Sequence, residues 1–219
     1  GLGSCVYIYS LIYTLKHKPL DFELADKIVV VDGFSQEQII SGARFSGEEY
    51  KELSREQDAF QYFSYYDSNY ISISGEGVAQ RYMAAYATED MFKVVSTYPE
   101  QGRQLNQQDL LEGAEPVAVI SHDLWQNYFG GTSDVVGASF YVEGNKTQVV
   151  GVMPEGFAFP LFHDIWLPFT ETKFKQAEQS PWSINIYGLL KPEISKEQGQ
   201  LILNNIYQNL PEARAKIIP

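Results

Sequence analysis

The sequence predicts an α+β fold with two subdomains, an outer part and an inserted part. Two observations lead to this prediction. Short runs of β-branched or alternating apolar residues predict strands, and capping boxes of the Ser-x-x-Glu or Ser-x-x-Gln type predict helix starts. Strands and helices do not alternate strictly along the chain, which argues against a series of βαβ units.

The outer part is predicted on both sides of the insert, as β–α–β before it and β–α after it. Before the insert we expect a helix that begins at Ser46, a turn at Asp67-Ser68, and strands at 27–32, 60–66, 69–75 and 78–87. After the insert, a loop from Thr170 to Pro181 should lead to a strand at 182–190. Ser195 and Gln198 form a second capping box, and its helix is expected to bury Leu201, Ile202, Ile206 and Leu210.

The insert has a mixed α/β pattern of its own. Asn106 is placed to cap a short helix, residues 116–120 predict a buried strand, and Ser121 is placed to cap the helix that follows. Residues 138–143 and 146–152 predict a hairpin linked at Gly144-Asn145. Trp125 and Trp166 are expected to pack in or beside the core of the insert. The outer strands at 27–32 and 184–190 are not expected to share a sheet with residues 135–152.

Composition limits the class of partner. The chain has 219 residues with 28 acidic and 16 basic side chains, a formal net charge of −12. Such a charge repels nucleic acids and anionic lipid surfaces, although it also simply favours solubility. The single cysteine, Cys5, excludes a disulfide within the chain and is compatible with either the cytosol or the periplasm.

No pattern in the chain predicts catalysis, a cofactor or a metal. Ser121, His122 and Asp123 have the residue types of a hydrolase triad, but neighbouring residues on a helix do not converge. His163 is interpreted as a surface residue at a turn. Asp109, Glu112 and Glu115 are interpreted as solvated charges. No phosphate-binding glycine motif occurs, so the chain itself should not bind ATP.

Aromatic residues are dense between Phe60 and Tyr70. Packing in the core or across strands is the favoured interpretation. The alternative is a surface for a partner protein, because aromatic side chains with polar groups are enriched at interfaces. The residues proposed for that surface are Tyr62, Tyr65, Tyr66 and Tyr70.

The segment Leu2 to Leu15 is apolar and uncharged, and Lys16-His17-Lys18-Pro19 ends it. It is too short to span a bilayer, which needs about 20 residues. Three interpretations remain: the outer end of a transmembrane helix, a lipoprotein start at Leu2-Gly3-Ser4-Cys5, or a buried helix.

The order of several motifs resembles one family, the periplasmic core domain of MacB-type and FtsX-like ABC-transporter permeases. The motifs are Thr88-Glu89-Asp90-Met91-Phe92, Gln101-Gly102-Arg103, EPVAVISHDLW, FGG, DVVG, VVGVMPEGF and IWLPF. The resemblance covers nearly the whole chain. It implies that residues 1–20 are the end of the first membrane helix, that 21–98 and 170–219 form a porter-like subdomain, and that 99–169 form a sabre-like insert.

What the resemblance implies is a non-catalytic periplasmic domain at the bacterial inner membrane. It would couple ATP-driven motion to export or efflux, with a second permease copy, a cytoplasmic ATPase and a periplasmic adaptor protein as partners, and no nucleic acid. If both ends enter the membrane, the regions near Lys27 and Leu210 should lie on the same side of the fold. The alternative function is a periplasmic ligand-binding protein or lipoprotein with a cleft between the two subdomains.

Overall fold

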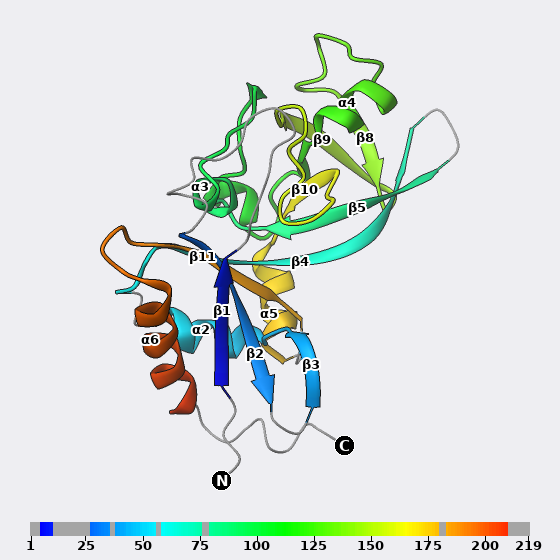
Figure 1. The fold of residues 1–219 in the computed structure, drawn as a ribbon. Helices are drawn as coiled ribbons and strands as arrows, with labels where there is room; N and C mark the ends of the chain where they lie inside the picture. Colours follow the sequence, from blue (N-terminus) through cyan, green and yellow to red (C-terminus); the bar gives the residue numbers. More distant parts are fainter. Residues whose placement is uncertain are drawn as a thin grey trace. The chain divides into compact units, whose positions relative to one another are not determined.

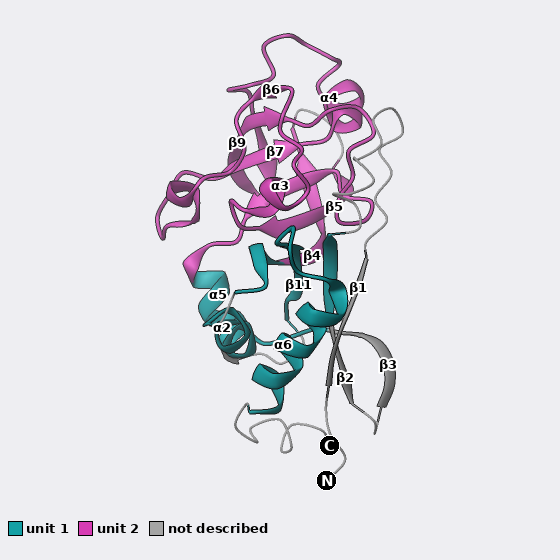
Figure 2. Ribbon diagram, turned by 60° about the vertical axis from the view of Figure 1, so that its left-hand side comes forward, with its two compact units in different colours: residues 1–12, 21–65, 172–219 teal, residues 13–20, 66–171 magenta. Residues whose placement is uncertain are grey.

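The computed structural model describes residues 5–10, 27–35, 38–55, 58–75, 79–179 and 183–209. The chain divides into two compact units, which are coloured separately in Figure 2. Unit 1 consists of residues 1–12, 21–65 and 172–219, and unit 2 of residues 13–20 and 66–171. Unit 1 combines helices with antiparallel strand pairs, and unit 2 combines helices with both antiparallel and parallel pairs, so the predicted α+β class is confirmed.

Unit 1 is built on a mainly antiparallel sheet (Figure 1). Its neighbouring strands run in the order β1-β2-β11-β4, and β3 pairs with β2 outside this series. Val29 pairs with Gly188, and Val31 with Ile186, and all four residues are buried. The strands are β1 (Cys5–Ser10), β2 (Ile28–Ser35), β3 (Gln38–Ala43), β11 (Asn185–Leu190) and the first residues of β4 (Phe60–Ser74).

The first strand corrects an expectation. Residues 2–15 were interpreted chiefly as a helix, yet Cys5–Ser10 form β1, which pairs antiparallel with β2 from Cys5↔Phe34 to Ser10↔Val29. The physical reason lies in Val6, Tyr7, Ile8 and Tyr9, which are β-branched or aromatic and favour strands. The helical interpretation is wrong for these six residues; the rest of the segment up to residue 26 lies outside the described residues.

Three helices pack in unit 1: α2 (Gly47–Arg55), α5 (Glu171–Gln179) and α6 (Lys196–Gln208). Both predicted capping boxes are confirmed. Ser46 N–H donates to Glu49 at 2.8 Å, and Ser195 N–H donates to Gln198 at 2.8 Å. Helix α5 replaces the loop expected from Thr170 to Pro181. Helix α6 buries Leu203 and Tyr207. Of the residues predicted to be buried, Ile202 and Ile206 are half-buried, but Leu201 is 69% exposed, so the prediction was wrong for Leu201.

The two described ends of unit 1 lie at the same end of it. In Figure 1 the start of β1 and the last turn of α6 are both at the lower end, and β2 starts at the opposite end. Lys27 Nζ donates to the carbonyls of Pro192 and Ile194, just before α6 begins. Because α6 has 13 residues, its far end is about 20 Å away. Lys27 thus does not meet the expectation that the regions near Lys27 and Leu210 lie on the same side of the fold; Leu210 itself lies outside the described residues.

Unit 2 contains a mixed sheet with strands in the order β4-β5-β10-β7-β9-β6, and β8 pairs with β4 and β9. β5 and β10 are parallel, as are β7 and β9, and the other pairs are antiparallel. These strands are β5 (Gln80–Ala87), β6 (Gln101–Gly102), β7 (Val117–Ile120), β8 (Ser139–Val142), β9 (Asn145–Val152) and β10 (Ile165–Pro168).

The sheet of unit 2 is covered on both faces. On one face Leu124 of α4 (His122–Tyr128) is buried in a cluster with inward-facing residues of the strands, among them Ile71, Ile73 and Ala84, and Trp125 packs against this cluster. On the other face the fully buried Trp166 contacts Phe92 and Phe157, at ring-centre distances of 6.1 and 5.2 Å. Phe92 belongs to the short helix α3 (Met91–Val94). The predicted core positions of Trp125 and Trp166 are confirmed.

Strand β4 corrects two expectations. It runs unbroken from Phe60 to Ser74, because Asp67 and Ser68, expected in a turn, pair with Tyr86 and Ala85 of β5. Its residues also belong to both units, so β2, β11 and β9 are members of one series of paired strands rather than of separate sheets.

The boundaries of the units differ in part from the predicted subdomains. The later boundary lies at 171/172, near the expected 169/170, but the earlier one lies at 65/66 instead of 98/99. The reason is packing: Ile71, Ile73 and Ala84 of β4 and β5 are buried in the same cluster as Ile120, Leu124 and Phe140 of the insert. The assignment of porter-like and sabre-like parts stays a prediction.

The hairpin turn lies one residue earlier than predicted. Val142 pairs with Asn145, so the two turn residues are Glu143 and Gly144, with φ angles of 48° and 81°. Positive φ at both central residues is typical of a type I′ turn.

Candidate functional site

Of the three triad-type residues, Ser121 and His122 make structural contacts, and Asp123 is exposed. Ser121 Oγ accepts the backbone N–H of Leu124 at 3.0 Å and so caps α4. The ring of His122 lies edge-on to the ring of Trp125, with a centre distance of 5.3 Å. Ser121 and His122 are thus committed to separate contacts, and the structure gives no hydrogen bond between them, as a nucleophile and its base would require.

His163 is the clearest correction among the candidate residues. It was interpreted as a surface residue, but it is 1% exposed. Its Nδ1 accepts from the Leu161 N–H at 3.3 Å, and its Nε2 lies 2.8 Å from Ser68 Oγ. The proton therefore lies on Nε2, which donates to Ser68. Burial lowers the pKa of His163 to about 4, so the ring is neutral at pH 7.

The described residues contain no group of three or more His, Cys, Asp or Glu side chains arranged to hold a metal ion. Nor do any helices in the described ranges have both the length and the apolar character required to cross a bilayer.

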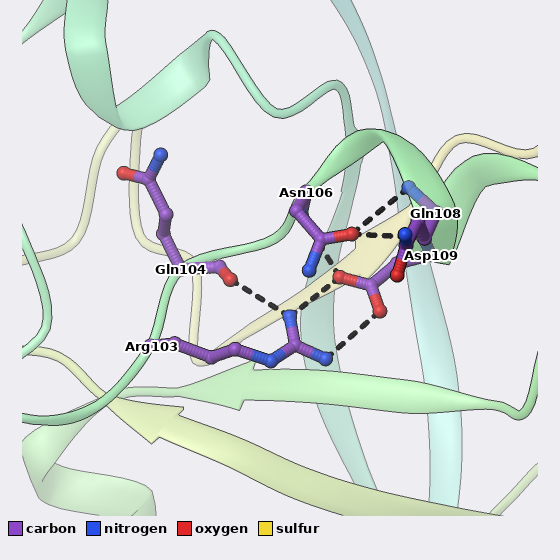
Figure 3. A network of polar contacts seen from close by, with 5 residues as sticks. All are labelled: Arg103, Gln104, Asn106, Gln108 and Asp109. Atoms are coloured by element: carbon purple, nitrogen blue, oxygen red, sulfur yellow. Dashed lines mark hydrogen bonds and ion pairs between the residues drawn. The ribbon is translucent and has the colours of Figure 1, made fainter.

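Arg103 and Asp109 form the best-connected polar network of unit 2 (Figure 3). The guanidinium donates to both carboxylate oxygens, at 2.6 and 2.9 Å, and also to the Gln104 carbonyl at 3.0 Å. Asp109 accepts the Asn106 N–H at 2.9 Å as well, and Asn106 Oδ1 accepts from Gln108 and Asp109. The hydrogen bond to Asp109 raises the pKa of Arg103.

This network has a structural rather than a binding role. It completes a capping box at the start of the helix η1 (Gln107–Leu110), where the sequence predicted Asn106 as the cap, and fixes this helix to the segment that pairs with β9. Asp109 is 8% exposed, so its interpretation as a solvated charge was wrong. Glu112 and Glu115 are exposed.

The four tyrosines proposed for a partner surface have different surroundings. In unit 1, Tyr62 is half-buried, and the Tyr65 ring packs on Tyr50 and Phe174, at centre distances of 4.5 and 5.1 Å. In unit 2, Tyr66 is buried and lies edge-on to His163, whereas Tyr70 is 61% exposed. Tyr70 is thus the most accessible of the four to a partner.

The loop before β10 has an exposed apolar tip that the sequence did not single out. Leu161 and Phe162 are 57% and 83% exposed, in the loop that precedes β10. The apolar run Phe157 to His163 gave a signal for it, since seven residues with only one polar side chain are more than a turn requires. Phe159 and His163, on either side of the tip, are buried. The sequence of the run therefore does not distinguish its exposed residues from its buried ones.

The family model of the MacB-like periplasmic core domain matches residues 1–205. The chain belongs to this family. A MacB-like periplasmic core domain is a periplasmic part of an ABC-transporter permease, and the resemblance expected from the sequence motifs is confirmed. Comparison with curated protein sequences finds no match.

Solved structures of other transporter domains share the fold of this MacB-like domain. The periplasmic region of MacB from Actinobacillus actinomycetemcomitans is 13% identical, with a TM-score of 0.64 over 83% of this chain and 82% of that one. A domain of a putative permease from Porphyromonas gingivalis is 14% identical, with a TM-score of 0.64 over 89% and 87%. The extracellular domain of the ABC-type transporter YknZ from Gram-positive bacteria is 17% identical, with a TM-score of 0.55 over 74% and 83%.

Proposed function

We propose that this domain is the non-catalytic extracytoplasmic part of its permease and passes ATP-driven motion of the membrane helices to partners outside. The observation that carries the proposal is the family match over residues 1–205. In this role the partners are a second permease copy, the cytoplasmic ATPase and a periplasmic adaptor protein. Transport is the task of the whole assembly, and the domain contributes contact and motion.

The arrangement of unit 1 fits this role. The start of β1 and the end of α6 lie at the same end of the unit (Figure 1), as a domain attached to two neighbouring membrane helices requires. Strand β1 pairs with β2 along its whole length, so a force on the start of β1 acts directly on the sheet. Motion of the attached helices would thus reach the unit as a rigid-body movement.

The chemistry of the described side chains also fits a non-catalytic role. Ser121 is used as a helix cap, His163 is buried and neutral at pH 7, and Asp109 is bound by Arg103. These three groups are thus used in the fold. The family match favours this function over a free-standing periplasmic ligand-binding protein.

Labelling in intact cells tests the location. In the full-length permease, Cys5→Ser removes the one cysteine of this domain, any cysteines elsewhere in the permease are replaced as well, and Lys146→Cys adds one in the exposed β8–β9 hairpin. A maleimide that does not cross the inner membrane should label Lys146→Cys in cells with a permeabilised outer membrane. Labelling only after the inner membrane is opened would contradict the extracytoplasmic location.

A further inference from the structure

Leu161 and Phe162 form an unusually exposed apolar tip. Among the large apolar side chains of the described residues, Phe162 is the most exposed, at 83%, and Leu161 beside it is 57% exposed. Scattered single apolar residues on a surface need no explanation, but two neighbours at one loop tip form a patch. Both belong to unit 2.

The loop that carries the tip is held in place from both sides. Phe159 is buried, and its carbonyl accepts the indole N–H of Trp166 at 2.9 Å. The backbone N–H of His163 donates to Ala158 at 3.2 Å, and its ring bonds to Leu161 and Ser68. A tip fixed by buried anchors loses little conformational entropy on binding, which favours affinity.

The surface next to the tip adds two further side chains of the type found at interfaces. Ser68, which bonds to His163, and Tyr70 are alternate residues of β4, so they lie on the same face of the strand. Tyr70 pairs across the strands with Met83, whose carbonyl accepts the Asp164 N–H at 2.9 Å. Arg81, which is exposed, lies with its guanidinium 5.4 Å from the centre of the Tyr70 ring.

These residues have the composition of an interface centre. Tyr and Arg dominate binding energy at protein interfaces, and aromatic residues are enriched there. The exposed parts of the Phe162 and Tyr70 rings amount to roughly 300 Å², since an aromatic side chain can bury about 150–250 Å². An area of that size suits the anchor of an interface whose full extent is about 800 Å² per partner.

Charge indicates the kind of partner. Arg81 has no carboxylate partner within the part of the chain that the structure describes, although the whole chain has a net charge of −12. A lone guanidinium that is stacked on an aromatic ring can still form a bidentate pair with a carboxylate. The net charge disfavours an anionic lipid surface and a second copy of the same domain, because both repel it.

We propose that Leu161, Phe162, Tyr70 and Arg81 form a docking surface for a protein that presents an apolar pocket with a carboxylate at its rim. Phe162 enters the pocket, Tyr70 and Leu161 cover its edge, and Arg81 pairs with the carboxylate. The inference rests on the proposed function, because such a partner must meet the permease outside the membrane.

Site-specific cross-linking in cells tests this docking surface. The photoreactive amino acid p-benzoyl-L-phenylalanine is placed at position 162 of the full-length permease, and in a matched strain at position 98, where the native Tyr98 is 53% exposed in the same unit. We expect light to join a different polypeptide to position 162 but not to position 98. The adduct should disappear when Arg81→Glu is added.

The partner is then identified and purified, and its affinity for the full-length permease is measured. Phe162→Ala and Arg81→Glu should each weaken binding at least tenfold, whereas Tyr98→Ala should not. Replacing one rim carboxylate of the partner with lysine should restore its binding to the Arg81→Glu variant. Three results would overturn the proposal. The first is an adduct between two permease copies or with a lipid, the second is an equal adduct from position 98, and the third is an affinity that Phe162→Ala leaves unchanged. The labelling test of location does not depend on Phe162. If Lys146→Cys is labelled from outside but the cross-linking and affinity tests fail, the docking surface is overturned and the extracytoplasmic location is not.

Discussion

Arg103 donates to both carboxylate oxygens of Asp109, at 2.6 and 2.9 Å, and thereby joins the short strand β6 to the helix η1. Asp109 is 8% exposed, and it accepts a further hydrogen bond from the Asn106 N–H. The pair therefore consists of a buried carboxylate and a guanidinium whose side chain is 45% exposed.

Removing one partner of this pair should destabilise unit 2. Arg103→Ala leaves the Asp109 carboxylate without its counter-ion, and we expect a loss of about 2–3 kcal/mol in the free energy of unfolding, measured by urea denaturation. Lys93→Ala is the matched control, since Lys93 pairs at 2.7 Å with Asp90, whose side chain is 34% exposed compared with 9% for Asp109. Its loss should be below about 0.5 kcal/mol. Equal losses for the two variants would show that burial of Asp109 does not strengthen the pair.

Ser121→Ala should lower stability through the loss of a helix cap. The Ser121 hydroxyl accepts from the Leu124 N–H at the start of α4, and its loss should cost about 1 kcal/mol. Ser133→Ala, in the exposed loop after α4, is the control and should change stability little. Thermal unfolding followed by circular dichroism measures both. An unchanged melting temperature for Ser121→Ala would contradict the cap.

Trp166→Ala should have a larger effect than Trp125→Ala. Trp166 is fully buried and donates to the Phe159 carbonyl, whereas Trp125 is partly buried beside the other core cluster. We expect Trp166→Ala to cost about 3–5 kcal/mol. Chemical denaturation of the two variants gives the comparison, and a larger loss for Trp125→Ala would reverse our assignment of the core.

His163 should make stability depend on pH in acid. Its pKa falls from 6.5 to about 4 on folding, so between these values the unfolded chain binds a proton that the native protein does not. Stability contributed by the neutral ring is complete above about pH 6.5 and decreases as the pH falls towards 4, by about 3 kcal/mol in all.

The test compares the wild type with His163→Gln between pH 7 and 4.5. The raised pKa values of Glu49 and Asp164, caused mainly by burial, act in the opposite direction but are common to both proteins. The difference in unfolding free energy between the two proteins should shrink as the pH falls. A constant difference would mean that His163 does not titrate differently on folding.

Elements could be predicted from the sequence where a local interaction, such as a helix cap, determines them. The capping boxes at Ser46 and Ser195 and the N-cap at Ser121 lie where the sequence predicted them, because a side-chain bond to the first turn is a local interaction. Asp67-Ser68 failed as a turn because pairing with Tyr86 and Ala85 of β5 outweighs the turn preference of these residues. That pairing joins residues about 20 positions apart, which local patterns do not report.

The burial of single residues was the least predictable part. Leu201 is exposed and Leu203 buried, because the face that α6 turns inward depends on its packing in unit 1. His163 and Phe162 are neighbours with 1% and 83% exposure, respectively, and only the fold of the loop separates them. The docking surface was missed for this reason, although Tyr70 was among its sequence candidates.

The central claim is that nucleotide-driven motion in the membrane reaches this domain, and energy transfer to the bilayer tests it most directly. The full-length transporter with its ATPase is placed in nanodiscs that contain acceptor-labelled lipid. A donor dye is attached to Lys146→Cys in unit 2, or to Glu197→Cys on α6, in the Cys5→Ser background. We predict that transfer efficiency changes between the nucleotide-free and ATP-trapped states, and that an ATPase variant unable to bind ATP shows no change. The claim would be contradicted if, at each of the two positions, the transfer efficiency were the same in all nucleotide states although the transporter hydrolyses ATP.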